Sequence, residues 1–203
     1  MADEIATWRP FITLVMAAIV VMGSPGPSTM SVTAVGAAFG LRRSIGYFSG
    51  LVVGTIAVLV AVATGVVSLL LSVPHAAPVL VAASAAYILY LAYRIATAPP
   101  LSKLCGDIAA PSFAGGFALA IANPKAYVAI AAVFAGTTLA DDPAPDALLK
   151  TTILAVMIVA IHMAWLLAGT VFSRVFYDPV YARIANAVFA VTLVVTAAIA
   201  FVP

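Results

Sequence analysis

The residues in this sequence that are best suited to chemistry are a lysine and a histidine inside long uncharged stretches. Lys125 follows Asn123 and Pro124 within the apolar stretch 113–136, and His162 lies in a later apolar stretch. A charged side chain at hydrocarbon depth costs about 2.5–3.5 kcal/mol on insertion scales, so ionisable residues there usually serve a function. An ammonium group binds carboxylates, and an imidazole gains and loses a proton near neutral pH. These two side chains are therefore the first candidates for substrate binding and proton movement.

The tripeptide that ends in Lys125 is expected to interrupt a helix. Pro124 lacks an N–H group and disfavours the helical conformation of the residue before it. Asn123 is expected to cap the helix that restarts after the interruption. The sequence leaves two roles open for Lys125. It could bind a substrate carboxylate, or it could clamp the interrupted segments together by donating hydrogen bonds to their free carbonyl groups.

A second interruption is expected early in the chain, within the apolar stretch 11–39. Pro25 and Pro27 flank Gly26, so the helix should stop before Pro25 and restart after Pro27. The restart leaves N–H groups free, which Ser28 or Thr29 could cap, and a helix N-terminus attracts carboxylates. A proline kink without a ligand is the alternative interpretation. Together the two interruptions supply the candidate substrate-binding residues Ser24, Pro25, Gly26, Pro27, Ser28, Thr29, Asn123, Pro124 and Lys125.

His162 has two interpretations that the sequence does not separate. A neutral histidine could be hydrogen-bonded to a neighbouring helix, or its side chain could couple transport to protons, a role for which Lys125 is the other candidate. No aspartate or glutamate lies inside an apolar stretch of this sequence. The membrane interior is therefore expected to lack the carboxylate relay that many antiporters use.

The composition is that of an integral helical membrane protein. Of the 203 residues, 65% are hydrophobic and only 8% are charged, whereas about a quarter of the residues of a soluble domain are charged. Several uncharged runs exceed the roughly 20 residues that span the hydrocarbon core. We expect an all-α fold in one transmembrane transporter domain, residues 1–203, surrounded by lipid and without a nucleic-acid partner. Its six transmembrane helices are expected at about residues 11–39, 44–71, 78–97, 113–136, 148–172 and 183–201.

Lysine and arginine residues divide unequally between the loops, and this division predicts the orientation of the chain. The predicted inner loops hold Arg42, Arg43, Arg94, Lys103, Arg174 and Arg183, and the outer segments hold only Arg9 and Lys150. Both termini of this multi-pass protein are therefore expected on the outer side of the cell inner membrane. Asp3 and Glu4 do not suit the basic start of a secretory signal, so the first span is expected to be retained.

The halves of the chain are expected to form a 3+3 inverted repeat. Three spans in each half require the second half to be inverted, and the interruptions at Pro25 and Pro124 fall at similar depths in spans one and four. Two broken helices in corresponding positions of two halves point to a transporter whose site lies near the membrane midplane.

Glycines recur at four-residue spacing in the second predicted span. Gly46, Gly50 and Gly54 follow Gly36 and Gly40, and such spacing makes a flat stripe where another helix approaches closely. The stripe could serve packing within the chain or form the face of a homodimer.

The sequence carries no signature of a cofactor or a metal centre. The single cysteine, Cys105, excludes an intramolecular disulfide and a two-thiol relay. Phosphate-binding loops, dinucleotide fingerprints and metal-ligand clusters are missing from the sequence, so no cofactor and no metal is expected.

These motifs together resemble the LysE/RhtB family of bacterial amino-acid exporters, and the resemblance covers the whole chain. It rests on Ser24-Pro25-Gly26-Pro27, Gly40-Leu41-Arg42-Arg43-Ser44-Ile45-Gly46, Phe113-Ala114-Gly115-Gly116 and Asn123-Pro124-Lys125-Ala126. The resemblance implies a small inner-membrane exporter of amino acids or similar small polar solutes that is driven by the proton gradient. Members often have an amide or acid directly after Pro-Gly-Pro, where this chain has Ser28, and this departure leaves the substrate open.

The function we expect is secondary active export of an amino acid or a similar zwitterion. Half-helix N-termini and Lys125 would receive the carboxylate, and carbonyl and hydroxyl groups would receive the ammonium. An inorganic cation exporter is one competing function, which the lack of intramembrane carboxylates opposes. A membrane-embedded enzyme would need a paired nucleophile, and an assembly factor would not need a lysine at that depth. The sequence leaves the coupling ion and the oligomeric state open.

Overall fold

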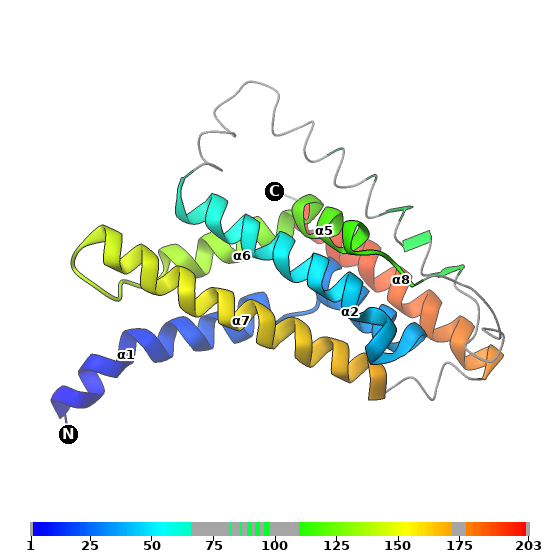
Figure 1. Ribbon diagram of the computed structural model, residues 1–203, viewed down its shortest axis with the longest axis horizontal. Coiled ribbons are helices and arrows are strands. Elements are labelled where there is room, and N and C mark those ends of the chain that lie inside the picture. Colours follow the sequence, from blue (N-terminus) through cyan, green and yellow to red (C-terminus); the bar gives the residue numbers. More distant parts are fainter. Residues whose placement is uncertain are drawn as a thin grey trace.

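The computed structural model describes residues 2–65, 110–171 and 178–201, together with scattered positions between 82 and 97. These parts of the chain are helical and contain no strand, in agreement with the expected all-α fold. The helices are α1 (Ala2–Ala17), the π-helix η1 (Ala18–Met22), α2 (Pro27–Ala63), α5 (Phe113–Ala122), α6 (Pro124–Ala135), α7 (Pro143–Val171) and α8 (Pro179–Phe201) (Figure 1). Most of the third predicted span lies outside the described residues, as do Arg94, Lys103, Cys105 and Arg174.

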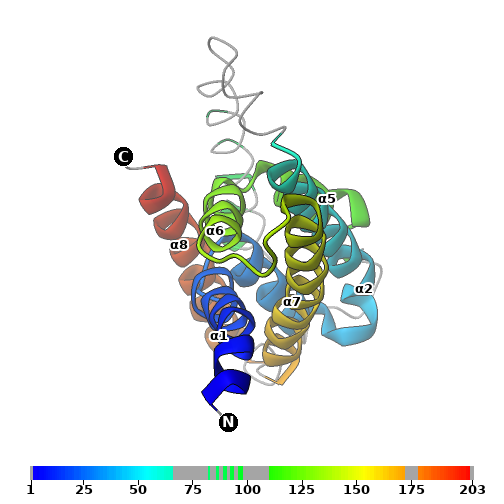
Figure 2. The same ribbon diagram turned by 90° about the vertical axis from the view of Figure 1, so that its left-hand side faces the viewer.

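α2 is the central element of the bundle and consists of two arms. It packs most extensively against α7 and α5, and it also contacts α6 and α8 (Figures 1 and 2). Gly40 interrupts its helical geometry with a φ of 71°, a conformation that glycine adopts readily. The Tyr47 hydroxyl donates to Ser31 Oγ at 3.0 Å, although 16 residues of straight helix would separate the two positions by about 24 Å.

The chain therefore folds back at Gly40, and its two arms lie side by side. Ser44 Oγ connects the two arms at the reversal. It donates to the Gly40 carbonyl at 2.6 Å and lies 3.1 Å from the Val35 carbonyl. Arg42 and Arg43 are exposed there. The reversal falls at the boundary that the sequence predicts between spans one and two.

Several glycines permit the close approach of helices within the chain. A Cβ atom at Gly50 would overlap the Phe113 carbonyl of α5, and one at Gly116 would overlap the Tyr47 carbonyl of α2. Gly54 likewise faces α5, while Gly36 of α2 and Gly169 of α7 form a second close contact. The predicted stripe thus serves packing within the chain at Gly36, Gly50 and Gly54. Gly46 takes no part in it, because nothing lies within 4 Å of the place where its Cβ would be.

Membrane-spanning candidates among the described residues agree with the apolar composition. By length and composition alone, α2 and α7 each suffice to cross a membrane, and α5 with α6 meets the same criteria as a pair bent by 62°. The length of α2 includes both of its arms, because the chain folds back at Gly40. Large apolar side chains are exposed along α7, including Leu148, Val156 and Val171, as expected for a helix that faces lipid.

Three helices begin earlier than the predicted spans. α1 begins at Ala2 and contains Pro10, whereas the first span was expected from residue 11. α7 begins at Pro143 and α8 at Pro179, rather than near residues 148 and 183. Proline suits the first turn of a helix because the N–H that it lacks would have no partner there. Pro143 and Pro179, which were expected in loops, therefore start helices instead.

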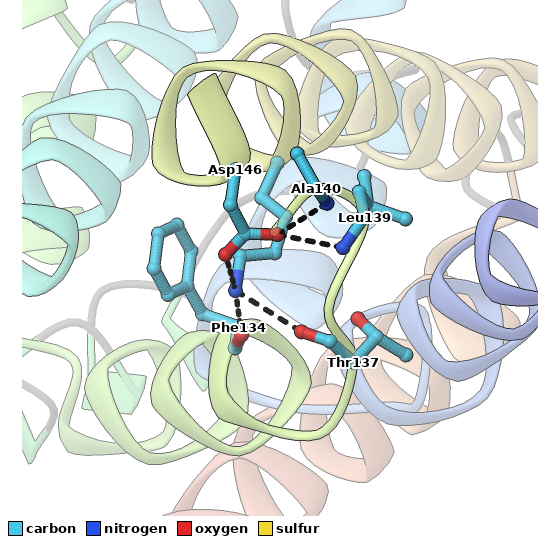
Figure 3. A network of polar contacts seen from close by, with 6 residues as sticks. Phe134, Thr137, Leu139, Ala140 and Asp146 are labelled. Carbon is cyan, nitrogen blue, oxygen red and sulfur yellow. Dashed lines mark hydrogen bonds and ion pairs between the residues drawn. The ribbon is translucent and has the colours of Figure 1, made fainter. Parts of the chain in front are cut away.

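An ion pair between buried Lys150 and partly buried Asp146 stabilises the turn between α6 and α7. The Lys150 ammonium lies 2.6 Å from Asp146 Oδ2 and donates to the carbonyl oxygens of Phe134 and Thr137, each at 3.0 Å (Figure 3). The other Asp146 oxygen accepts the backbone N–H of Leu139 at 2.6 Å. The Phe134 carbonyl near the end of α6 and the Thr137 carbonyl just beyond it are thus satisfied by a side chain of the next helix.

Candidate functional site

The first chain interruption separates η1 from α2 at residues 23–26. Gly26 has extended backbone geometry, Pro27 takes the first helical position, and Thr29 supplies the cap. Thr29 Oγ1 accepts the Gly26 N–H at 2.8 Å, and the Met30 N–H donates to the Gly26 carbonyl at 2.8 Å. Of the two predicted capping residues, Thr29 therefore fulfils the role and Ser28 does not.

The second interruption is the single extended residue Asn123 between α5 and α6, with Pro124 opening α6. Asn123 was expected to cap α6, and this expectation is wrong, because its side chain makes no bond to that helix. The amide Nδ2 instead donates to Ser28 Oγ at 2.7 Å. Asn123 thus connects the second interruption directly to the start of α2.

Lys125 binds the first interruption from α6. Its Nζ lies 2.7 Å from Ser24 Oγ, 2.8 Å from the Ser24 carbonyl oxygen and 2.7 Å from that of Pro25. An ammonium group has three protons to donate, so these acceptors match its full capacity. A Cβ atom at Gly26 would lie 2.7 Å from Lys125 Cδ and 2.8 Å from Nζ, so the approach of the lysine requires glycine there. These contacts are the ones expected of a lysine that clamps the interrupted segments together.

A third side chain holds the first interruption from α7. Trp165 Nε1 donates to the Gly23 carbonyl at 3.1 Å. Tyr127 similarly joins the two sides of the second interruption, because its hydroxyl donates to the Ile121 carbonyl at 3.0 Å. Both aromatic residues therefore support the interruptions.

The two interruptions and His162 border one cavity. The volume of the cavity is about 40 Å³, counted as the space that the centre of a water-sized sphere can occupy. One water molecule needs roughly 10–15 Å³ on this measure, so the cavity has room for a few. The lining residues are Met22, Ser24, Gly26, Ser28, Thr29, Thr55, Asn123, Lys125, Ala126, Ala129, Ile130 and His162. Six of the nine predicted substrate-binding residues are among them. The three prolines are not, although the Pro25 carbonyl binds Lys125.

His162 lines this cavity and carries a buried acceptor atom. The side chain is 5% exposed, and its Nδ1 lies 2.8 Å from the Ile158 carbonyl oxygen, one turn earlier in α7. A carbonyl oxygen only accepts, so Nδ1 carries the ring proton and Nε2 of the neutral imidazole is an acceptor. Nε2 is buried and has no partner among the described residues. The ring therefore bonds to its own helix, and not to a neighbouring one.

Asn123 presents a second such acceptor. Its side chain is 3% exposed, and while Nδ2 bonds to Ser28, Oδ1 is buried without a partner in the described part of the chain. Buried polar atoms are nearly always hydrogen-bonded, and each exception calls for an explanation, such as a bound water, an ion or a functional role. Two unsatisfied acceptors on residues of one cavity identify this place as the candidate site.

The chain is similar to known proteins over most of its length. The family model described as LysE type translocator matches residues 19–202. The chain belongs to the LysE family. Relatives of this LysE-family chain include the cysteine/O-acetylserine efflux proteins of Escherichia coli (strain K12) and Shigella flexneri. Each is 32% identical over 173 residues, which cover 84% of this chain and 87% of the relative. No solved structure matches the chain.

Family membership confirms the resemblance that the sequence motifs indicated. A translocator moves a solute across a membrane, so this LysE-family protein is a transporter and not an enzyme. Membership together with the long apolar helices makes it a multi-pass membrane protein. In the described part of the chain no three histidine, cysteine, aspartate or glutamate side chains group as metal ligands would.

The sequence alone did not point to Thr55 as part of this site. Thr55 lies on the second arm of α2, is 4% exposed, and donates to the Leu51 carbonyl at 2.8 Å. The signal in the sequence was a hydroxyl group in an otherwise apolar stretch. This signal is unspecific, because threonine hydroxyls in membrane helices commonly bond to a carbonyl of their own helix, as Thr55 does. The reversal at Gly40 brings Thr55 to the cavity, and the reversal is a tertiary feature.

Proposed function

We propose that this LysE-family protein is a secondary active exporter of amino acids or similar small zwitterions. The substrate site in this proposal is the cavity between residues 23–26 and Asn123. Six spans form the transporter, the first and fourth being broken helices of a 3+3 inverted repeat. The protein lies in the cell inner membrane with both termini outside.

One observation carries the proposal, namely that Lys125 and Asn123 join two interrupted segments around a common cavity. Interrupted backbone at membrane depth is tolerated where it lines a cavity or is buried in protein. The cavity-lining residues include the cation Lys125 and no carboxylate among those the structure describes. A site with an uncompensated positive charge attracts an anionic group, and an amino acid supplies one in its carboxylate.

The carboxylate is proposed to lie at the start of α2, where it competes with Ser24 for the Lys125 ammonium. Three neutral acceptors hold that ammonium in the structure, and a carboxylate is a stronger acceptor than any of them. The clamp and substrate roles of Lys125 are then successive states of one side chain. The cavity must widen for this exchange, because an amino acid is larger than a few water molecules.

The relatives guide the choice of substrate. They are named for the efflux of cysteine and O-acetylserine, both α-amino acids with short side chains. We propose substrates of this size for the present chain, exported in exchange for protons. Proton exchange requires a group that titrates near neutral pH, and His162 is the candidate that borders the cavity.

Counterflow into proteoliposomes tests this proposal. Vesicles loaded with one unlabelled amino acid are placed in its labelled form, over a panel that includes O-acetyl-L-serine, L-cysteine, L-serine and L-lysine. The panel also contains a divalent metal ion as a non-zwitterionic probe. Accumulation of a small amino acid is the expected result. Transport of the metal ion alone would favour the inorganic cation exporter, and transport of nothing on the panel would contradict the proposal.

A further inference from the structure

The unsatisfied acceptors of the cavity indicate what binds opposite Lys125. His162 Nε2 and Asn123 Oδ1 are both buried, both lack a partner among the described residues, and both belong to residues that line the cavity. Each accepts hydrogen bonds in the state observed, and neither has a proton to donate from that atom. A single group that satisfies both must be a donor with at least two protons.

We infer that His162 Nε2 and Asn123 Oδ1 together bind the ammonium group of the substrate, and that a proton competes with this ammonium for Nε2. This inference rests on the proposed function and adds the residues that recognise the amino group. An ammonium group has three protons to donate, so it can satisfy both acceptors and retain one for a hydroxyl such as that of Thr55, which also lines the cavity.

The cavity lining holds both a cation and neutral acceptors. Lys125 is held against the Ser24 and Pro25 carbonyls, which lie in the first interruption. His162 belongs to α7 and Asn123 to the second interruption, so the cation and the two free acceptors are contributed by different elements. A zwitterion requires both kinds of group, a cation for its carboxylate and neutral acceptors for its ammonium.

Competition at Nε2 supplies a simple means of exchange. Neutral His162 accepts the substrate ammonium, whereas protonated His162 has no acceptor atom and repels the ammonium. The residues that α2 and η1 contribute to the cavity lining are uncharged. Among the lining residues that the structure describes, the charged group is Lys125 of α6. Substrate binding is therefore expected to weaken as the pH falls and His162 becomes protonated.

The test compares three side chains at position 162 in proteoliposomes. His162→Phe keeps a ring and removes the acceptor, while His162→Gln keeps a neutral acceptor that does not titrate. The matched control is Thr152→Ala on the same helix, where an exposed hydroxyl bonds only to the Leu148 carbonyl. The probe is the amino acid that the unmodified protein exchanges best, compared with its 2-hydroxy acid analogue, which lacks the ammonium. The amount of each variant in the membrane is measured first.

The inference predicts a distinct result for each variant. His162→Phe raises the half-saturation concentration for the amino acid at least about tenfold, as the loss of one hydrogen bond to a charged group implies. The same variant changes competition by the 2-hydroxy acid by less than about threefold, because that compound has no ammonium to lose a partner. His162→Gln retains exchange but loses the weakening of binding at low pH that this inference expects of the unmodified protein.

Asn123→Leu provides the independent second test, because it removes the other acceptor. It should also raise the half-saturation concentration for the amino acid more than that for the 2-hydroxy acid. Equal losses for the two compounds in both variants would overturn the ammonium site. A pH dependence that survives in His162→Gln would overturn the competition. If the unmodified protein exchanges no amino acid, the proposed function fails, whereas normal exchange with unchanged variants contradicts this inference alone.

Discussion

At the scale of single residues, the contact between Lys125 and Gly26 explains why glycine is needed next to Pro25. The ammonium reaches two carbonyl groups and one hydroxyl of Ser24 and Pro25, and it does so across the bare Cα of Gly26. The φ of Gly26 is −171°, an extended conformation that any residue adopts. Glycine is thus required there for space and not for backbone freedom.

Gly26→Ala is accordingly predicted to weaken transport through Lys125. The new methyl group would displace Nζ from its acceptors, and overpacking of this kind costs about 1–3 kcal/mol. Thermal unfolding in detergent and counterflow measure the two effects. In a Lys125→Ala background the same substitution should cost much less, because the displaced side chain is gone. Equal costs in the two backgrounds would show that the methyl group acts on something other than the lysine.

At the scale of elements, a local sequence indicates where a helix ends but not what surrounds that end. The positions of Pro25, Pro27 and Pro124 suffice to locate the ends of the helices, because a missing N–H is a local property. The contact of Asn123 with Ser28 depends on how α2 and α6 approach each other, and the local capping rule therefore failed. The packing of the helices also decides which residues Thr55 and His162 lie beside. For this reason the sequence did not predict Thr55 as a site residue and did not identify the hydrogen-bond partner of His162.

The glycine contacts between α2 and α5 allow a matched pair of substitutions. Gly116→Ala should lower the free energy of unfolding by about 1–3 kcal/mol, because its Cβ would overlap the backbone of Tyr47. Gly46→Ala should instead raise it by about 0.4–1 kcal/mol, since the site is open and alanine restricts the unfolded chain. Unfolding midpoints in detergent decide between these outcomes. A lower free energy of unfolding for Gly46→Ala would contradict this expectation and would indicate that position 46 is packed, for example against a second copy of the chain.

The ion pair at the α6–α7 turn is predicted to be structural. Lys150→Met would leave the Phe134 and Thr137 carbonyls and the Asp146 carboxylate without their cation, at a cost of about 1–3 kcal/mol in the free energy of unfolding. The exposed Asp141→Asn is the control and should change stability little. Exchange per folded molecule should be unaffected, because Lys150 does not line the cavity. A loss of exchange without a loss of stability would instead assign the turn to the transport cycle.

At the scale of the whole molecule, fold class and family were accessible from sequence because they depend on composition and on a few motifs. Apolar runs predict the helices, and the motifs around Pro25 and Pro124 are part of the resemblance to the family, whose model matches residues 19–202. The sequence does not show that the two interruptions lie next to each other, because their contact depends on how the helices pack. The fold-back at Gly40 places the second arm of α2 beside the first and so brings Thr55 to the cavity.

Orientation in the membrane is predicted by the loop charges and can be measured directly. Reporter fusions at Ser102 should report the cytoplasm, and fusions at Pro143 should report the outside, because lysine and arginine favour inner loops. The opposite pattern would reverse the orientation of the chain. Two fusions that report the same side would contradict both the span count and the inverted repeat.

The central claim, a substrate site between two interruptions that Lys125 bridges, is tested most directly by Lys125→Met in the counterflow assay. Methionine keeps most of the side-chain length and removes the charge, and an apolar residue inserts at this depth more easily than lysine. We predict normal amounts of the variant in the membrane and a near-total loss of amino-acid exchange, with Thr152→Ala as the active control. Full exchange by Lys125→Met would contradict the account, because the lysine would then be needed neither to bind the substrate nor to hold the two interruptions together.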